Sequence, residues 1–102
     1  MKLYDMAHVV RSKNSGPFAV TLDILFDNRE AYERMRASGA VTPAAIARLY
    51  HIPEDAITDF AFFDAAMGVK ITYLRAVSSG TVGDRDVYGA QQHAPLMTID
   101  IP

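Results

Sequence analysis

The 102-residue chain contains no cysteine. It can therefore form no disulfide framework, and cysteine-based nucleophiles and metal ligands are excluded. The sequence also has no hydrophobic run that approaches the roughly 18 residues of a membrane-spanning helix. The N-terminal stretch MKLYDMAHVV lacks the long apolar segment of a signal peptide. We therefore expect a soluble, cytoplasmic protein without a membrane partner.

A strong charge of either sign is missing as well. The net charge is −2 and the isoelectric point is about 5.8, so there is no overall basic field to hold nucleic acid. Any basic site must be local. Half of the residues are hydrophobic and 22% are charged, which is ordinary for a globular protein. The length predicts a single domain over residues 1–102.

The best-defined element of secondary structure is a strand over residues 18–27, FAVTLDILFD. Apolar side chains occupy every second position, which predicts a strand with one face on the core. The residues of that face are Phe18, Val20, Leu22, Ile24 and Phe26. An earlier, shorter strand is predicted over residues 3–10.

A polar loop is expected between these two strands, at residues 11–17, RSKNSGP. Its small residues could turn successive N–H groups inward as an anion nest, closed by Arg11 or Lys13. The spacing of a Walker loop is absent, and a strand follows instead of a helix. The alternative is a solvated connection whose Asn-Ser-Gly-Pro run makes turns. The spacing alone does not decide between the two.

Two helices are predicted next. Asp27 and Glu30 fit a capping box at the start of the first helix, and Gly39 is a natural stop. In the second helix, Thr42 is expected to cap the N-terminus and Pro43 to occupy the first helical position.

Further strands are predicted over residues 56–64 and 69–77, separated by a short break. The long, weakly patterned stretch 78–88 reads as a loop. A closing strand is expected at the end of the chain, because apolar residues alternate at Met97, Ile99 and Ile101.

This order of elements predicts an α+β fold, a ferredoxin-like antiparallel sheet with helices packed on one face. The other face of such a sheet is bare. It would carry an apolar patch, which usually marks an interface, so we expect a homo-oligomer or docking onto a partner. The residues expected on this patch are Tyr4, Met6, Leu25, Phe63 and Leu74.

Several motifs resemble the domain of unknown function 4387 family. They are RSKNSGPF at residues 11–18, TLDI at 21–24, ARLY at 47–50 followed by Ile52-Pro53, and YGAQQHAPL at 88–96. More distantly, the chain is similar to the ferredoxin-fold C-terminal domain of acyclic terpene utilisation (AtuA-type) proteins. The resemblance implies a small subunit or domain that works with a larger AtuA-type α/β protein. It also implies a role in the catabolism of acyclic or branched acids, as carboxylates or coenzyme A esters, but supplies no reaction.

The first functional hypothesis is therefore an accessory subunit that packs its bare sheet face on an AtuA-type partner and helps to form an anion-binding cleft. Cationic side chains would hold a carboxylate or phosphate, and amides would orient polar substrate atoms. His93 is the candidate catalytic residue, because it can move protons near neutral pH. The candidate substrate- or anion-binding residues are Arg11, Ser12, Lys13, Asn14, Tyr88, Gln91 and Gln92. The alternative for the run at 91–93 is a structural anchor whose amides bond loop backbone.

Two other hypotheses remain. One is a self-sufficient homo-oligomeric hydratase or isomerase, with acid–base candidates His8, Asp64, Asp86 and His93. The other is a module that senses a small acid, by analogy with other uses of the fold. The sequence contains no HxH or HExxH spacing and no dinucleotide fingerprint, so we predict neither a metal site nor a cofactor.

Overall fold

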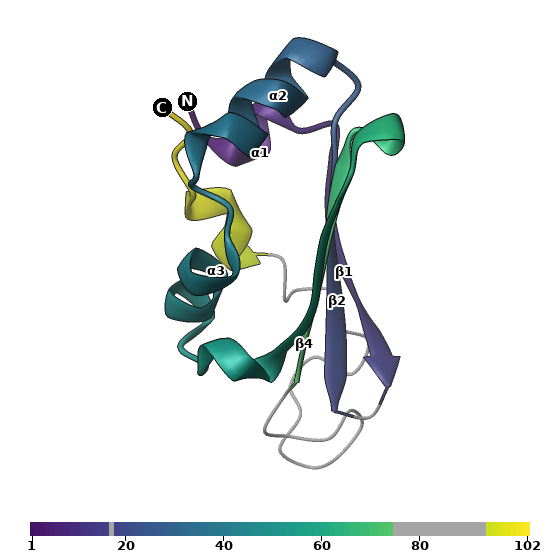
Figure 1. Cartoon of the computed structure of the whole chain (residues 1–102), viewed down its shortest axis with the longest axis vertical. Helices are drawn as coiled ribbons and strands as arrows, with labels where there is room; N and C mark the ends of the chain where they lie inside the picture. The colour runs from purple at the N-terminus through teal and green to yellow at the C-terminus, as the bar shows by residue number, and fades with distance from the viewer. Residues whose placement is uncertain (17, 75–93) are drawn as a thin grey trace.

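The computed structural model describes residues 1–16, 18–74 and 94–102. Its centre is one four-stranded antiparallel sheet in the order β1 (Val9–Gly16), β2 (Ala19–Leu25), β4 (Gly68–Leu74) and β3 (Ile57–Phe63). The helices α1 (Leu3–Met6), α2 (Arg29–Ser38) and α3 (Pro43–Tyr50) lie on one side of this sheet (Figure 1). The predicted α+β class, with helices on one face, is confirmed.

The connection between β2 and β3 defines the topology. The chain leaves β2, passes through α2 and α3, and enters β3, and β4 then inserts between β2 and β3 as the antiparallel partner of both. This is a split β-α-β unit, which is consistent with a ferredoxin-like arrangement. Two short 3-10 turns flank β3, Glu54–Ala56 before it and Asp64–Ala66 after it.

The hydrophobic core lies between the sheet and the helices. In β2, the predicted core face is confirmed at Val20, Leu22 and Ile24, which are fully buried. Phe18 departs from the prediction and is 53% exposed, because β2 begins only at Ala19 and does not include it. The other buried apolar residues come from β4, the helices, the connections on either side of α2 and both ends of the chain: Leu3, Phe26, Tyr32, Met35, Val41, Ile46, Ala47, Val69, Ile71, Tyr73, Leu96 and Ile101.

Local signals set the helix ends with one exception. Thr42 caps α3 by accepting a hydrogen bond from the N–H of Ala45 at 3.1 Å, and Pro43 begins the helix, as predicted. Gly39 ends α2 at φ +74°, a left-handed conformation that suits glycine. The N-cap of α2, however, is Asn28 and not Asp27. Its Oδ1 accepts a hydrogen bond from the N–H of Ala31 at 3.0 Å.

Both ends of the chain differ from the prediction. The expected strand over residues 3–10 is a helix, α1, followed by β1 from Val9 onward. The expected closing strand is a 3-10 helix, Ala94–Thr98, followed by a single bridge between Lys2 and Asp100. The buried residues here are Leu96 and Ile101, which lie on opposite parities, so no regular strand could bury both on one face. The terminal amino group of Met1 donates a hydrogen bond to the carbonyl oxygen of Ile101 at 3.1 Å, so the two chain ends lie side by side (Figure 1).

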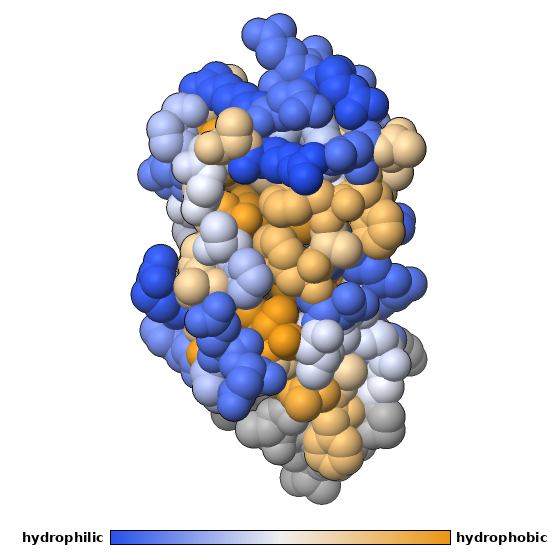
Figure 2. All heavy atoms as spheres, viewed as in Figure 1, coloured by the Kyte–Doolittle hydropathy of each residue, from blue (hydrophilic) through white to orange (hydrophobic). Residues whose placement is uncertain are grey.

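The surface is not uniformly polar. Figure 2 shows a band of hydrophobic side chains that runs down the molecule between the helical layer and the sheet, below a hydrophilic cap. Partly buried apolar residues that pack against the core include Ile57, Phe60 and Phe62 of β3. These side chains face the helices, since their register partners on β4 are core residues.

Candidate functional site

The candidate site is the sheet face opposite the helices, called the open face from here on. Because side chains alternate along a strand, the face is defined by the residues between the core positions of each strand. Among the residues that the structure describes, no helix packs on it (Figure 1). Its side chains fall into rows across the sheet, set by the strand register.

Three rows make up most of the open face, each read from β1 to β3. The apolar row consists of Val9, Leu25, Gly68 and Phe63. The charged row consists of Arg11, Asp23, Lys70 and Ala61. The threonine row consists of Lys13, Thr21, Thr72 and Asp59.

An ion pair organises the charged row. The Nε of Arg11 donates to Oδ2 of Asp23 at 3.2 Å, and the Asp23 side chain is only 14% exposed. Lys70 lies opposite Asp23 on the other neighbouring strand. One carboxylate is thus flanked by two cations, and Lys13 adds a further positive charge on β1. The β1 side of the open face is therefore positive.

The threonine row is held by a hydrogen bond between side chains. The hydroxyls of Thr21 and Thr72 lie 3.1 Å apart, and Thr21 is almost fully buried. This bond satisfies a polar group that would otherwise be costly to bury. It ties the two central strands together between Lys13 and Asp59.

The apolar row contains a notch. A small pocket is bordered by Leu25, Phe63 and Gly68, with Asp23 and Lys70 at its polar edge. A Cβ atom at Gly68 would lie 2.5 Å from Cδ2 of Leu25 and 3.2 Å from the carbonyl oxygen of Ile24, so a larger residue here would displace the Leu25 side chain and crowd the neighbouring backbone. Phe63 is half exposed beside it, as predicted for the bare face.

The predicted apolar patch is only partly present. Leu25, Phe63 and Leu74 belong to strands and have register positions on the open face, as expected. Tyr4 and Met6 do not, because they lie on α1. Charged and threonine rows also separate the apolar row from Leu74, so the face is amphipathic instead of uniformly hydrophobic.

The predicted anion loop at residues 11–17 is wrong in its conformation, since β1 extends to Gly16. Arg11 and Lys13 are exposed on the open face, whereas Ser12 and Asn14 are half-buried on the opposite, helix-facing side. Successive N–H groups of a strand point in opposite directions, so they cannot converge on an anion as a nest does. The structure therefore keeps the two cations together and separates them from Ser12 and Asn14.

The second predicted group falls outside the described residues. It comprises Tyr88, Gln91, Gln92 and His93, together with the acid–base candidate Asp86. Their roles stay predictions.

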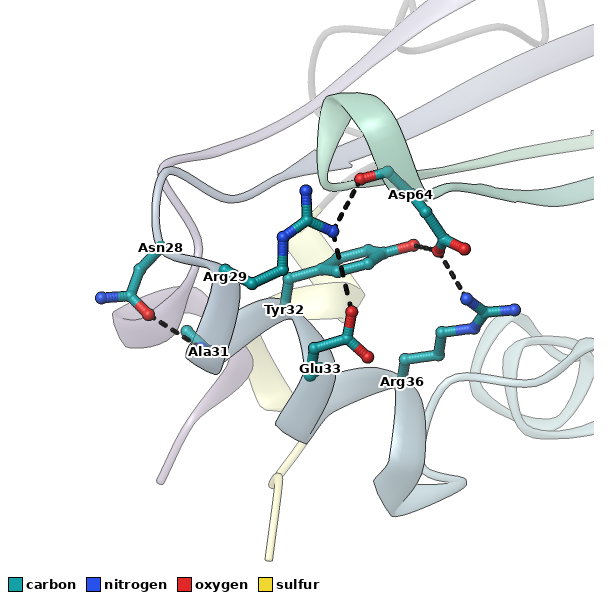
Figure 3. A network of polar contacts seen from close by, with 7 residues as sticks. All are labelled: Asn28, Arg29, Ala31, Tyr32, Glu33, Arg36 and Asp64. Atoms are coloured by element: carbon teal, nitrogen blue, oxygen red, sulfur yellow. Dashed lines mark hydrogen bonds and ion pairs between the residues drawn. The ribbon is translucent and has the colours of Figure 1, made fainter.

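Two other acid–base candidates have partners already. His8 lies at the surface, with Nδ1 3.3 Å from Oδ2 of Asp27. Asp64 accepts hydrogen bonds from the hydroxyl of Tyr32 and the guanidinium of Arg36 (Figure 3). Both interactions, that of Tyr32 first, hold the pKa of Asp64 below its usual range. A carboxylate in this state is a poor proton donor or acceptor near neutral pH.

Sequence reasoning missed the cluster around Asp64. Tyr32 and Arg36 are four residues apart on α2 and reach the turn after β3, and Arg29 donates to the Asp64 carbonyl oxygen at 2.9 Å (Figure 3). Burial, with help from Asp64, raises the pKa of Tyr32 to about 12, so its hydroxyl stays protonated and donating. The cluster therefore fastens α2 to the β3–β4 connection. The i, i+4 spacing was visible in the sequence, but the distant carboxylate was not.

Residues 1–16, 18–74 and 94–102 contain no group of three or more histidine or acidic side chains that could hold a metal ion. In the same ranges, no helix has the length and apolar character needed to cross a bilayer.

Comparison with known proteins assigns the family. Residues 3–100 match the family described as Domain of unknown function (DUF4387). The chain belongs to the DUF4387 family. No curated protein and no solved structure matches it.

Proposed function

We propose that this DUF4387 protein is an accessory binding subunit or domain, which holds an organic anion on Arg11 and Lys13 and completes its site only with a larger partner. The observation that carries the proposal is the placement of these two exposed cations on one sheet face, on which no helix of the described residues packs. The ligand would be a carboxylate or a coenzyme A ester.

The spacing of the two cations suits such a ligand. Residues two apart on a strand lie about 7 Å from each other on the same face, so two long side chains can converge on one anionic group. Lys70 can approach from the other side of Asp23. Arginine adds a planar pair of donors that matches the two oxygens of a carboxylate.

The exposure of these cations argues for a partner. An ion pair in full contact with water contributes about 0–1 kcal/mol, which is too little to hold a small acid. A second protein that covers the open face would exclude water and strengthen each of these contacts. The apolar row and Leu74 would provide hydrophobic contact area on either side of the cations. The family resemblance suggests an AtuA-type α/β protein in this role.

The alternative, a self-sufficient hydratase or isomerase, receives less support. Two of its four acid–base candidates, His8 and Asp64, are engaged with other side chains. The other two lie outside the described residues. An acid-sensing module remains the second alternative and requires ligand binding by the isolated chain.

The test uses the purified chain and a purified AtuA-type protein from the same organism. Complex formation is measured by size-exclusion chromatography with light scattering, and binding of a branched carboxylate or its coenzyme A ester by calorimetry. We expect Arg11→Ala with Lys13→Ala to weaken ligand binding by tenfold or more. Ser12→Ala, on the opposite side of β1, is the control and should change binding by less than twofold.

A second pair of variants tests the docking face. Phe63 and Tyr4 are equally exposed, at 51% and 52%, but only Phe63 lies on the sheet. Phe63→Ser should weaken the complex and Tyr4→Ser should not. Turnover by the isolated chain would contradict the proposal in favour of the small enzyme. Tight acid binding by the isolated chain would favour the sensor.

A further inference from the structure

We infer that, in the isolated protein, the open face binds the open face of a second copy about a twofold axis parallel to the strands. The inference concerns the chain without a partner and rests on the order of residues across the sheet, independently of the proposed function.

The order of charge across the open face is asymmetric. In the charged row, the sequence from β1 to β3 is positive, negative, positive, neutral. In the threonine row, a cation, Lys13, lies on β1 and an anion, Asp59, lies on β3, with two neutral residues between them. The apolar row carries no charge. A face of this kind has one positive edge and one negative edge.

Such a twofold axis runs along the strands, midway between two facing sheets. It places each row opposite the same row of the second copy, with the order of the strands reversed. Strand β1 then faces β3 of the second copy, and β2 faces β4. Lys13 meets Asp59 of the second copy, and Asp23 meets Lys70. Each contact occurs twice by symmetry, as in any isologous interface.

The remaining contacts of this arrangement are also compatible. Arg11 faces Ala61 of the second copy, so no like charges oppose each other in the charged row. In the apolar row, Val9 faces Phe63 and Leu25 faces the notch at Gly68. Polar rows thus meet polar rows, and the apolar row meets itself.

The other twofold arrangement of two facing sheets is disfavoured by charge. An axis perpendicular to the strands places β1 over β1 of the second copy. Between the apolar and charged rows, this axis would lay Arg11 over Val9 and Asp23 over Leu25, which buries charges against apolar side chains. At the charged row, at the threonine row or between them, it brings Arg11 over Arg11, Lys13 over Lys13, or Arg11 over Lys13. Each of these contacts opposes two cations, which destabilises an interface. The charge order therefore selects the axis parallel to the strands.

The size of the face sets the expected strength. Four strands at about 4.8 Å spacing and about 23 Å of strand length give roughly 440 Å² for each copy. A total near 900 Å² is below the range of stable complexes, so we expect a weak, reversible dimer. Facing sheets pack about 10 Å apart at an angle near −30°, and the long lysine side chains can bridge the resulting displacement at the edges.

Arg11 and Lys13 would lie inside the contact, so self-association would occupy the surface that the proposed partner needs. A partner would then have to displace the second copy. The face would not be left open to solvent in either state.

The experiment uses charge reversal and analytical ultracentrifugation on the full chain. Lys13→Asp places an anion at each end of the threonine row, and Asp59→Lys places a cation at each end. In both variants, like charges then face each other in the dimer. Each single variant should raise the dimer dissociation constant about tenfold, since two attractive contacts become repulsive. Added salt should weaken the wild-type dimer, because exposed charges are screened.

Recombination of the charges provides the decisive measurement. An equimolar mixture of the two single variants should restore wild-type affinity as a heterodimer, and so should the double variant Lys13→Asp/Asp59→Lys. Within one chain the two residues lie on opposite edges of the sheet, about 14 Å apart, so a pair inside the chain cannot explain such a rescue.

Matched controls separate this outcome from general effects. Glu54→Lys makes the same charge change as Asp59→Lys at an exposed position outside the sheet and should leave the dimer unaffected. Both reversed residues are exposed, so circular dichroism should show an unchanged fold. A monomeric wild-type chain at millimolar concentration would overturn the inference. So would single variants that dimerise like the wild type, or a mixture that stays as weak as its components.

Discussion

Leu25 and Gly68 are register partners on β2 and β4, and the Leu25 side chain occupies the space where a side chain on Gly68 would lie. A Cβ atom at position 68 would come 2.5 Å from Cδ2 of Leu25 and 3.2 Å from the carbonyl oxygen of Ile24. The leucine can rotate away from this contact, but the backbone oxygen cannot. Alanine at this position would therefore require Leu25 to rotate and the backbone of Ile24 to shift by a few tenths of an ångström.

Gly68→Ala should lower the free energy of unfolding by about 1–2 kcal/mol, as overpacking commonly does. Urea denaturation measures the change. Leu25→Ala removes the atoms nearest to the new Cβ. Gly68→Ala should therefore cost less stability when it is added to Leu25→Ala than when it is added to the wild type. If Gly68→Ala is as stable as the wild type, position 68 does not lie as close to Leu25 and to the carbonyl oxygen of Ile24 as described.

The N-cap of α2 can be tested by comparing two adjacent residues. Asn28→Ala removes the acceptor for the N–H of Ala31 and should destabilise the protein by about 1 kcal/mol. Asp27→Ala, one residue earlier, should have a smaller effect, since its observed contact is the exposed pair with His8. Thermal unfolding would distinguish the two, and the reverse order would restore Asp27 as the cap.

The Asp64 cluster predicts a pH dependence of stability. The pKa of Asp64 is lowered in the folded state, so its contribution to stability is fully present above the unfolded pKa of about 3.8. The contribution is lost as the pH falls through the lower folded value. Asp64→Asn should therefore reduce stability at pH 7 and flatten the loss of stability between about pH 5 and pH 2. Tyr32→Phe should have a smaller effect, because Arg36 remains. A parallel pH profile for Asp64→Asn and the wild type would contradict this assignment.

The threonine row predicts a coupled pair. Thr21→Val leaves the Thr72 hydroxyl without its partner in this bond and should cost about 1 kcal/mol. The double variant Thr21→Val/Thr72→Val removes both polar groups at similar volume, so it should be no less stable than the single variant. Urea denaturation of the four proteins in this double-mutant cycle gives the coupling energy. Additive losses would show that the two hydroxyls do not interact.

Features that depend on neighbours in the sequence were predictable. The alternating residues of β2 and β4 required burial of one face, and Thr42 with Pro43 marked the start of α3 through contacts within one helical turn. The misplacement of the α2 cap by one residue shows the limit of such signals, since Asp27 and Asn28 are both suitable cap residues. The residue types at this point indicate that a helix begins here, but they do not distinguish Asp27 from Asn28 as its N-cap.

Features that depend on distant partners were not predictable. Residues 11–16 are polar and read as a loop, but pairing along β2 draws them into a strand. The hydrogen bonds that engage Asp64 come from α2, a helix more than twenty-five residues away in the sequence. The alternating residues near the C-terminus predicted a strand, yet burial of Leu96 and Ile101 produced a 3-10 helix and a single bridge.

The sequence by itself determined the class of fold, because apolar residues at intervals of two and at helical spacing specify which faces must be buried. It also determined that cations occur at positions 11 and 13. Only the tertiary structure decided that Arg11 and Lys13 share the open face, while Ser12 and Asn14 face the helices. It also decided that these two cations lie on one edge strand of the sheet and Asp59 on the opposite edge strand. Strand register sets these relationships, and register arises from pairing between segments that are far apart in the chain.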